Sequence, residues 1–322
     1  MPFTLLMLPP QTETTSAWAQ RLAAELPFVR VVAAATEAEA TAAIPTAEAA
    51  FGTLNPQMLA AAGRLRWLAA PQAAPPAGYY YPELVAHPVV VTNMREIYND
   101  HIGAHILAFV LAFARDFQTY LPAQARREWA PRPLDTGVIA LDEATALIVG
   151  LGGIGAEAAR LLAAFGVRVL ATDARRTALT EGVAELHPVG ALDDLLGQAD
   201  FVILTVPHTP ATEGFMHRAR FRRMKRGAFF INIGRGRTTR LDDLAAALAA
   251  GEIAGAGLDV FETEPLPPGH PLWTMPGVLI TPHTAGYGPH LDERRYAILR
   301  DNCRAFEAGT ALRNQVDKAN WF

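Results

Sequence analysis

The stretch Ala-Leu-Ile-Val-Gly-Leu-Gly-Gly-Ile-Gly, from Ala146 to Gly155, decides the fold of this 322-residue chain. Its first four residues are apolar and predict a buried strand, and Gly150, Gly152 and Gly155 fill the pattern G-x-G-x-x-G. In such a turn the first glycine allows a tight exit from the strand, the second lets the backbone approach a pyrophosphate, and the third lets a helix pack on the strand. The start of that helix offers unpaired N–H groups to phosphate oxygens. The stretch therefore predicts a dinucleotide-binding site.

The residues that follow support this interpretation. Apolar residues at helical spacing predict a helix over Gly153–Phe165, and a second strand over Val167–Thr172 leads into Asp173. An acid at this position of a Rossmann unit holds the adenosine ribose hydroxyls. Its charge would also repel a 2′-phosphate, so we expect NAD as the cofactor and NADP less. The alternative stays open because Arg175 and Arg176 are able to pair with such a phosphate.

Short apolar runs alternate with helical patterns on both sides of this unit, which is typical of parallel α/β sheets. Further strands are expected at Phe3–Leu8, Phe28–Val32, Ala49–Phe51, Arg66–Ala69, Val89–Thr92, Ala146–Gly150, Phe201–Thr205, Ala228–Asn232, Gly255–Asp259 and Val278–Thr281. Further helices are expected at Ser16–Glu25, Thr36–Ala43, Pro56–Ala62, Leu192–Gly197, Arg218–Met224 and Leu241–Ala250.

The predicted fold class is α/β, with two Rossmann- or flavodoxin-like domains built on parallel sheets. An amphipathic segment, Asp292–Ala308, is expected to return to the first domain. Residues 1–99 and 291–322 would then form a discontinuous substrate-binding domain, with a cofactor domain of residues 100–290 inserted in it. A long helix from Asp100, its expected cap, to Tyr120 is apolar nearly all round, which predicts burial between domains or between subunits.

Composition excludes several classes of protein. The formal net charge of −4 provides no basic surface for nucleic acid, and the longest apolar segment, His105–Ala114, is too short to cross a membrane. A single cysteine, Cys303, allows no disulfide within the chain and is expected to be a packing residue. We therefore expect a cytoplasmic protein without nucleic-acid or membrane partners, and the sequence predicts no metal site.

Three residues that follow predicted strands are suited to anion and acid–base chemistry: Arg235, Glu264 and His283. Ligands bind outside the carboxyl ends of the strands in open α/β sheets, so we expect these side chains to meet in one cleft. Arg235 can hold a carboxylate with two parallel hydrogen bonds, and His283 can exchange a proton with a carbonyl oxygen as hydride is transferred. Glu264 can orient the imidazole, although Glu262 competes for that role.

These motifs together resemble the D-isomer-specific 2-hydroxyacid dehydrogenase family over nearly the whole chain. The resemblance is carried by Gly150–Gly155, Val206-Pro207 with Thr209-Pro210, Ile233–Gly236, Asp259–Pro265 and Thr281–Gly286. It implies a catalytic trio of Arg235, Glu264 and His283, and a homodimer that is formed through the helix near residues 100–120. The cofactor contacts expected from the glycine turn and the resemblance are Gly150, Gly152, Gly153, Ile154, Gly155, Asp173, Val206, Pro207, Thr209, Ile233, Gly234, Arg235, Asp259, His283 and Ala285.

The expected substrate loops depart from the family's pattern. The family usually has a Ser-Ala-Gly-like turn whose N–H groups hold the substrate carboxylate, whereas Ala70–Pro76 contains prolines and no glycine. A few residues after Asn93, where the family often has glycine, this chain has Glu96.

We expect the substrate carboxylate to meet backbone N–H groups near Gln72, Ala73 and Ala74 and the guanidinium of Arg235. Gln72 and Arg95 are the side chains expected to set specificity. A solvated loop position for Gln72, and a surface or interdomain salt bridge for Arg95, are the alternatives.

The function predicted from these features is NAD(H)-dependent interconversion of small 2-oxo acids and D-2-hydroxy acids. The substrate would be similar to glyoxylate, hydroxypyruvate or pyruvate, or bulkier. One alternative is a dehydrogenase of another small anion, either phosphite or, less readily, formate, because formate enzymes carry glutamine where this chain has Glu264. A second is an NAD-sensing binding protein or corepressor, which an intact trio does not exclude.

Overall fold

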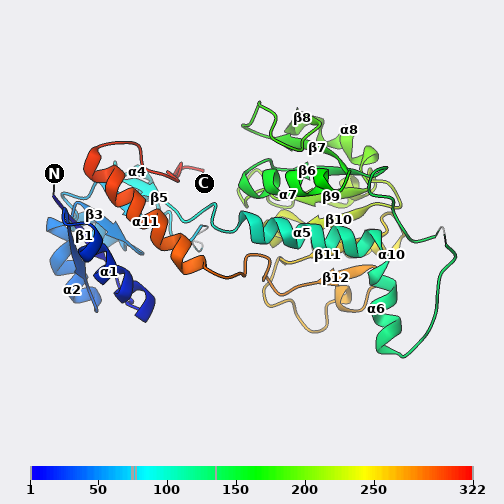
Figure 1. The fold of residues 1–322 in the computed structure, drawn as a ribbon, viewed down its shortest axis with the longest axis horizontal. Coiled ribbons are helices and arrows are strands. Elements are labelled where there is room, and N and C mark those ends of the chain that lie inside the picture. Colours follow the sequence, from blue (N-terminus) through cyan, green and yellow to red (C-terminus); the bar gives the residue numbers. More distant parts are fainter. Residues whose placement is uncertain (1, 74–75, 77, 135, 321–322) are drawn as a thin grey trace. The chain divides into compact units, whose positions relative to one another are not determined.

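The computed structural model describes residues 2–73, 76, 78–134 and 136–320. The chain divides into two compact units, Met1–Ile97 with Pro289–Phe322, and Tyr98–Gly288 (Figure 1). None of the helices in the described ranges is long and apolar enough to cross a membrane. Among the same residues, no group of three or more His, Cys, Asp or Glu side chains is placed to hold a metal ion.

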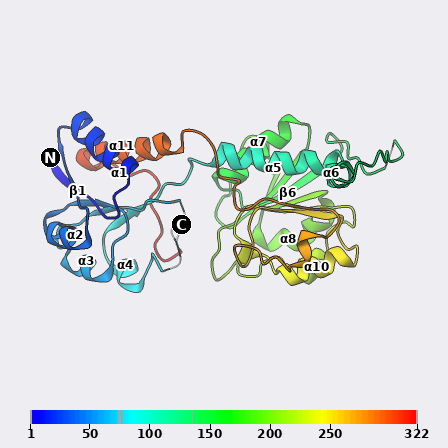
Figure 2. The ribbon, with the colours of Figure 1, turned by 90° about the horizontal axis from the view of Figure 1, so that it is seen from below.

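The first unit is built on a five-stranded parallel sheet with the order β2-β1-β3-β4-β5, which is the flavodoxin-like order. Its strands are β1 (Phe3–Met7), β2 (Val29–Ala33), β3 (Ala49–Phe51), β4 (Trp67–Ala69) and β5 (Val90–Thr92). Its helices are α1 (Glu13–Glu25), α2 (Glu37–Ala43), α3 (Pro56–Ala61), α4 (Pro82–Ala86) and α11 (Leu291–Ala308). Figure 2 shows α1 and α11 on one face of the sheet and α2, α3 and α4 on the other. Because both faces are covered, β3 and β4 are fully buried and read as unbroken apolar runs.

Helix α11 brings the end of the chain back to the first unit. The ring of Phe306 lies 4.7 Å from that of Phe3 and 5.6 Å from that of Trp67, measured between centroids. On the same helix Cys303 is buried, and burial raises the pKa of its thiol to about 12, so this cysteine is an unreactive packing residue.

The second unit is built on a seven-stranded parallel sheet with the order β12-β11-β10-β9-β6-β7-β8. From the opposite edge this is the Rossmann order 3-2-1-4-5-6 with a seventh strand added. Its strands are β6 (Thr145–Val149), β7 (Arg168–Asp173), β8 (Glu185–Pro188), β9 (Phe201–Leu204), β10 (Phe229–Asn232), β11 (Gly255–Leu258) and β12 (Val278–Ile280). Its helices are α5 (Asn99–Ala114), α6 (Phe117–Ala125), α7 (Gly153–Ala164), α8 (Leu192–Leu195), α9 (Arg218–Phe221) and α10 (Leu241–Ala249). The predicted fold class, with two parallel α/β sheets, is confirmed.

Alternation along β6 divides the second unit into two cores. Leu147 and Val149 belong to the core that includes residues of α8, α9 and α10, whereas Ala146 and Ile148 belong to the core that includes residues of α5 and α7. Figure 2 shows α5 and α7 on one face of this sheet and α8 and α10 on the other. This pattern explains why β6 is apolar throughout, as a strand covered on both faces must be.

The prediction of one helix from Asp100 to Tyr120 was wrong. Helix α5 ends at Ala114, and Asp116 adopts a left-handed backbone conformation with φ of 60° before α6 begins. The buried carboxylate of Asp116 accepts hydrogen bonds from Gln118 and Thr119 at 2.9 and 2.8 Å, which stabilise the break. The expected cap is also displaced, because Tyr98 precedes the first helical residue and Asp100 lies in the first turn.

The position of α5 explains why its sequence is so apolar. Phe113 is fully buried and stacks on Phe229 of β10, with ring centroids 4.4 Å apart. The helix therefore buries its apolar face against its own sheet. Short elements with weak periodicity, namely α4 and β8, were missing from the sequence-based expectation.

Candidate active site

The glycine turn lies where the strand order of the second sheet reverses, between β6 and β9. Gly150 has φ of 99°, and its carbonyl oxygen accepts a hydrogen bond of 2.5 Å from the hydroxyl of Thr205 at the end of β9. A Cβ added to Gly155 would lie 2.2 Å from the Gly150 carbonyl oxygen, so only glycine lets α7 begin this close to β6. Gly152 is the residue before the first turn of α7, and Gly153 and Ile154 open that turn. This is the geometry that the motif predicts for a pyrophosphate site.

Asp173, at the end of β7, is held by the backbone around it. Its carboxylate accepts N–H groups from Leu151, Arg175 and Arg176 at 2.7, 2.8 and 2.7 Å. Burial alone would raise the pKa of Asp173, but these three N–H groups and the charge of Arg175 outweigh burial and lower it. The Arg176 guanidinium donates in turn to the Leu151 carbonyl at 2.8 Å. The carboxylate is thus ionised and fixed beside the glycine turn.

The expected contacts Val206, Pro207 and Thr209 lie in the loop after β9. The Thr212 hydroxyl closes this loop, because it accepts the Thr209 N–H at 2.8 Å and donates to the Pro207 carbonyl at 2.7 Å. A Cβ on Gly234 would lie 2.7 Å from the Val206 carbonyl oxygen. The loops after β9 and β10 are therefore in contact.

Arg235 is carried by a turn that Asn232 organises. The buried Asn232 side chain accepts the Gly234 N–H at 3.0 Å and donates to the Arg235 carbonyl at 3.2 Å. Burial lowers the pKa of the Arg235 guanidinium and the negative charge of Glu264 opposes that shift, but arginine keeps its charge in proteins. Ile233, which lies between Asn232 and Gly234, is buried in the core. The sequence offered a signal for Asn232, since asparagine side chains commonly accept a hydrogen bond from the backbone N–H two residues later in such turns.

His283 and Glu264 form a hydrogen-bonded pair. His283 Nδ1 lies 2.7 Å from Glu264 Oε2, and the other carboxylate oxygen of Glu264 accepts the Phe261 N–H at 2.9 Å. The imidazole is half exposed, and its Nε2 is the nitrogen left to meet a substrate. The competing acid, Glu262, accepts instead the Leu241 N–H at the start of α10, at 2.8 Å. Glu264 is thus the histidine's partner, and one ring nitrogen is held while the other can exchange a proton.

Asp259 has a structural task as well as the cofactor contact expected of it. Its carboxylate is almost fully buried and accepts the N–H groups of Thr284 and Ala285 at 2.8 and 2.9 Å. The Thr281 hydroxyl donates to the same carboxylate at 2.6 Å. Ala285 is itself buried in the core. Asp259 therefore fixes the loop on which His283 lies.

The expected substrate loops belong to the first unit. The buried Asn93 side chain donates to the Ala73 carbonyl at 2.8 Å, and the Met94 N–H donates to the Gln72 carbonyl at 3.4 Å. The loop after β4 is thus tied to the loop after β5 through its carbonyl groups, and the Gln72 side chain is exposed. Ala74 lies outside the described residues.

Segment Arg313–Val316, near the chain end, holds the loop after β5. The Arg95 guanidinium donates to the Gln315 carbonyl at 3.0 Å, in place of the salt bridge considered for it. Glu96 has φ of 79°, the left-handed region that favours glycine, and its carboxylate is paired with Arg313 at 3.1 Å. Glu96 therefore adopts a backbone conformation that is typical of glycine, and its side chain forms an ion pair with Arg313.

We expect Gly236→Ala to destabilise the second unit, because the added Cβ would lie 1.9 Å from the carbonyl carbon of Phe261. Backbone cannot yield as a flexible side chain does, so the free energy of unfolding should fall by about 1–3 kcal/mol. Urea unfolding followed by circular dichroism measures this change. Gly227→Ala is the matched control, since its Cβ would meet nothing within 4 Å. Equal losses in the two variants would contradict the close approach of these loops.

Comparisons with known proteins agree with this geometry. The sequence model of the family "D-isomer specific 2-hydroxyacid dehydrogenase, NAD binding domain" matches residues 107–285, more than half of the chain and all within the second unit. Glyoxylate/hydroxypyruvate reductase A of Serratia proteamaculans is 36% identical over 213 residues, which are 66% of this chain and 66% of that protein. Glyoxylate reductase/hydroxypyruvate reductase of Homo sapiens is 40% identical over 162 residues, which are 50% of this chain and 49% of that protein.

The likeness to solved structures extends to both units. A D-isomer specific 2-hydroxyacid dehydrogenase from Xanthobacter autotrophicus Py2, in complex with NADPH and MES, is 30% identical with a TM-score of 0.83, and the match covers 100% of both chains. The second unit is accordingly a domain that binds NAD or NADP. The chain belongs to the D-isomer-specific 2-hydroxyacid dehydrogenases, a family of oxidoreductases.

Proposed function

We propose that the protein reduces small 2-oxo acids to D-2-hydroxy acids and catalyses the reverse oxidation. The observation that carries this proposal is the pair of His283 and Glu264, whose 2.7 Å hydrogen bond leaves one imidazole nitrogen for proton exchange. The charged Arg235 lies within electrostatic reach of the same glutamate. The relatives from Serratia and human, named as glyoxylate and hydroxypyruvate reductases, point to a substrate of two or three carbons.

In this proposal each side chain has one task. A bound nicotinamide dinucleotide supplies the hydride that reduces the carbonyl carbon. His283 gives the proton on Nε2 to the carbonyl oxygen as negative charge develops there, and Glu264 stabilises the charged imidazole at Nδ1. Arg235 binds the substrate carboxylate with parallel hydrogen bonds. The products would be the hydroxy acid, the oxidised dinucleotide and a neutral His283, which is protonated again from solvent.

We also propose that the loop after β4 binds the substrate carboxylate. Hydrogen bonds to the carbonyl groups of Gln72 and Ala73 fix this loop, and the backbone N–H groups of the same two residues are the donors that we assign to the carboxylate. The Arg95 guanidinium donates to the Gln315 carbonyl, and since a guanidinium has five N–H groups we propose that it also donates to the substrate.

We expect His283→Ala to lower kcat for glyoxylate or hydroxypyruvate by about 10²–10⁴-fold, which is the usual contribution of acid–base catalysis. Arg235→Ala should mainly raise the KM for the oxo acid, because a carboxylate contact is lost. Both are measured from NADH absorbance. His187→Ala on β8 and the exposed Arg237→Ala are matched controls. Wild-type turnover in His283→Ala would refute its assigned role, and NADH binding without turnover of any oxo acid or of phosphite would favour a sensor protein.

We propose NAD as the preferred cofactor, on the ionised and fixed carboxylate of Asp173. The rival is NADP, which the Xanthobacter relative binds in reduced form and which Arg175 and Arg176 would favour. Asp173→Asn removes the charge that repels a 2′-phosphate while it keeps a side-chain oxygen for the backbone N–H groups. We therefore expect the ratio of kcat/KM for NADPH to that for NADH to rise about tenfold, equivalent to about 1.4 kcal/mol. A wild-type enzyme that already prefers NADPH would contradict the proposal.

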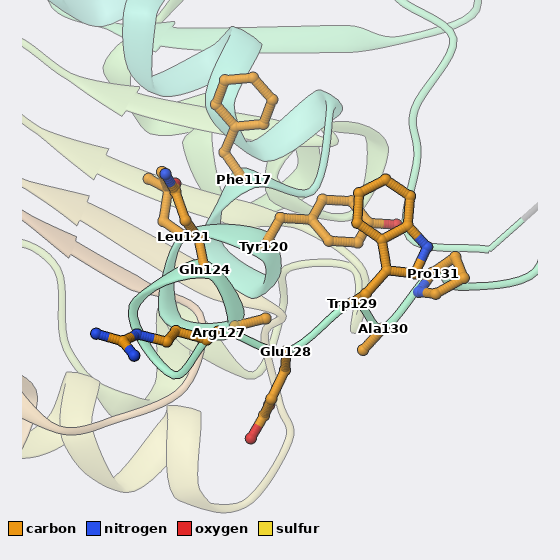
Figure 3. A pocket seen from close by; sticks show the side chains of 10 residues that line it. Phe117, Tyr120, Leu121, Gln124, Arg127, Glu128, Trp129, Ala130 and Pro131 are labelled. Atoms are coloured by element: carbon orange, nitrogen blue, oxygen red, sulfur yellow. The ribbon is translucent and has the colours of Figure 1, made fainter.

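We infer a homodimer that is formed through the helical region near residues 100–120, and we assign α6 and the segment after it to that interface. Phe117, Leu121, Trp129 and Leu134 are exposed by 51%, 51%, 96% and 100%. The first three line a hollow with Tyr120, Gln124, Arg127 and Pro131 among its other residues (Figure 3). Exposed apolar residues gathered in this way mark an interaction surface. A second copy is the occupant we favour because the family resemblance implies a homodimer.

Trp129→Ser should convert the dimer to a monomer, since a large apolar contact is replaced by a small polar one. Light scattering after size exclusion should then give 34.7 kDa, the mass of one chain, where the wild type gives twice that mass. Trp273→Ser, at a tryptophan that is 49% exposed elsewhere, is the matched control. A variant that keeps the dimeric mass would contradict this surface.

The cytoplasm is the proposed location, because the one cysteine is buried and a reducing compartment suits such a chain.

A further inference from the structure

His105 on α5 reaches the strand ends that carry the acid–base pair. Its Nε2 lies 3.0 Å from the hydroxyl oxygen of Thr281, the residue that follows β12. One turn along the helix, the Phe109 ring packs edge-on against the imidazole, with centroids 4.8 Å apart. A Cβ on Gly257 of β11 would lie 2.9 Å from that ring. The glycine therefore lets Phe109 approach the sheet, which holds His105 beside Thr281.

The chain of hydrogen bonds continues in one direction only. The Thr281 hydroxyl lies 2.6 Å from a carboxylate oxygen of Asp259, and a carboxylate can only accept. The single hydroxyl proton of Thr281 is therefore given to Asp259. It follows that Thr281 accepts from His105, whose Nε2 must carry a proton.

Both forms of the imidazole satisfy this requirement. Burial lowers the pKa of His105, against the opposite effect of the Asp259 charge. The neutral ring with its proton on Nε2 can donate to Thr281, and so can the charged ring. The hydrogen bond from His105 to Thr281 is therefore present in both the neutral and the charged form of the imidazole.

The loop that this chain holds has an unfavourable backbone. His283 has φ of 55°, a region that residues with side chains rarely adopt. Its N–H donates to the Asp259 carbonyl at 2.8 Å, while the Asp259 carboxylate holds the next two N–H groups, those of Thr284 and Ala285. Asp259 can hold the loop in this way only while its own carboxylate is kept in place.

We propose that His105 and Thr281 are positioning residues that fix the Asp259 carboxylate, and through it the loop that presents His283. This inference rests on the proposed function, because it assigns the purpose of the chain to the acid–base residue. Neither side chain is given a contact with substrate. Loss of the hydrogen bonds from His105 to Thr281 and from Thr281 to Asp259 should therefore slow proton transfer and leave the binding of the oxo acid nearly unchanged.

The test compares variants of His105 and Thr281 that remove their hydrogen bonds with variants that retain a hydrogen-bonding group. Thr281→Val and His105→Leu remove the hydrogen bonds, whereas Thr281→Ser and His105→Gln retain a group of the same kind. We expect kcat with glyoxylate at saturating NADH to fall about tenfold in the first pair, with KM for glyoxylate within about twofold, and to be largely restored in the second. The double variant Thr281→Val/His105→Leu should be no slower than the slower single variant, because both break one chain.

Amide hydrogen exchange of residues 281 and 283–286 provides a second readout that needs no activity. It should be faster in Thr281→Val and His105→Leu than in the wild type, and unchanged in Thr281→Ser and in the exposed control Thr274→Val. If the wild type turns over none of the oxo acids, the proposed function fails. Amide hydrogen exchange alone then tests whether His105 and Thr281 position Asp259. Wild-type exchange in Thr281→Val and His105→Leu, or effects on kcat that multiply in the double variant, would overturn this positioning role.

Discussion

The parallel register of the second sheet is the constraint on which the candidate site depends. Val149 pairs with Leu204, Leu204 with Asn232, Asn232 with Leu258, and Leu258 with Ile280. Each of these residues is the last of its strand, so five neighbouring strands end level with one another. The turns that follow are therefore brought to one edge by backbone hydrogen bonds alone. Side chains that are more than a hundred residues apart in sequence need only short loops to meet there.

Local sequence predicted most of the fold because both sheets are covered on two faces. Strands such as β6 and β9 then consist of uninterrupted apolar residues, and glycine-rich or polar turns separate them from helices. The break between α5 and α6 could not be foreseen in this way, because no proline or glycine marks it. It depends on the left-handed Asp116, whose carboxylate accepts hydrogen bonds from two residues of α6 at one oxygen and is paired with Arg132 at the other. The spacing of apolar residues in a sequence shows which face of a helix is buried. A break in the helix does not alter that spacing when the same face stays buried on both sides of the break.

The residues of the candidate site also differ in whether the sequence could predict them. Arg235, Glu264 and His283 were predicted because each residue type has an evident chemistry and follows a strand. Thr281 was named only as part of a motif and Asn93 only as a residue before Glu96, and the long-range partners that define their structural tasks are visible only in the folded chain. His105 was read as one residue of an apolar helix, since nothing local indicates that it would reach a residue 176 positions later. Polar residues that hold other residues in place are thus harder to recognise than those that carry chemistry.

The ion pair between Glu96 and Arg313 makes the conformation of the loop after β5 depend on a segment near residue 313. A glycine at residue 96 would adopt its backbone angle without help, whereas glutamate adopts it with a side chain that is anchored on the C-terminal segment. Asn314 reinforces this connection, because its side chain donates to the Arg95 carbonyl at 2.8 Å. A substitution of Arg313 or Asn314 would therefore disturb the loop after β5, although these residues lie 217 and 219 positions later in the sequence than their partners.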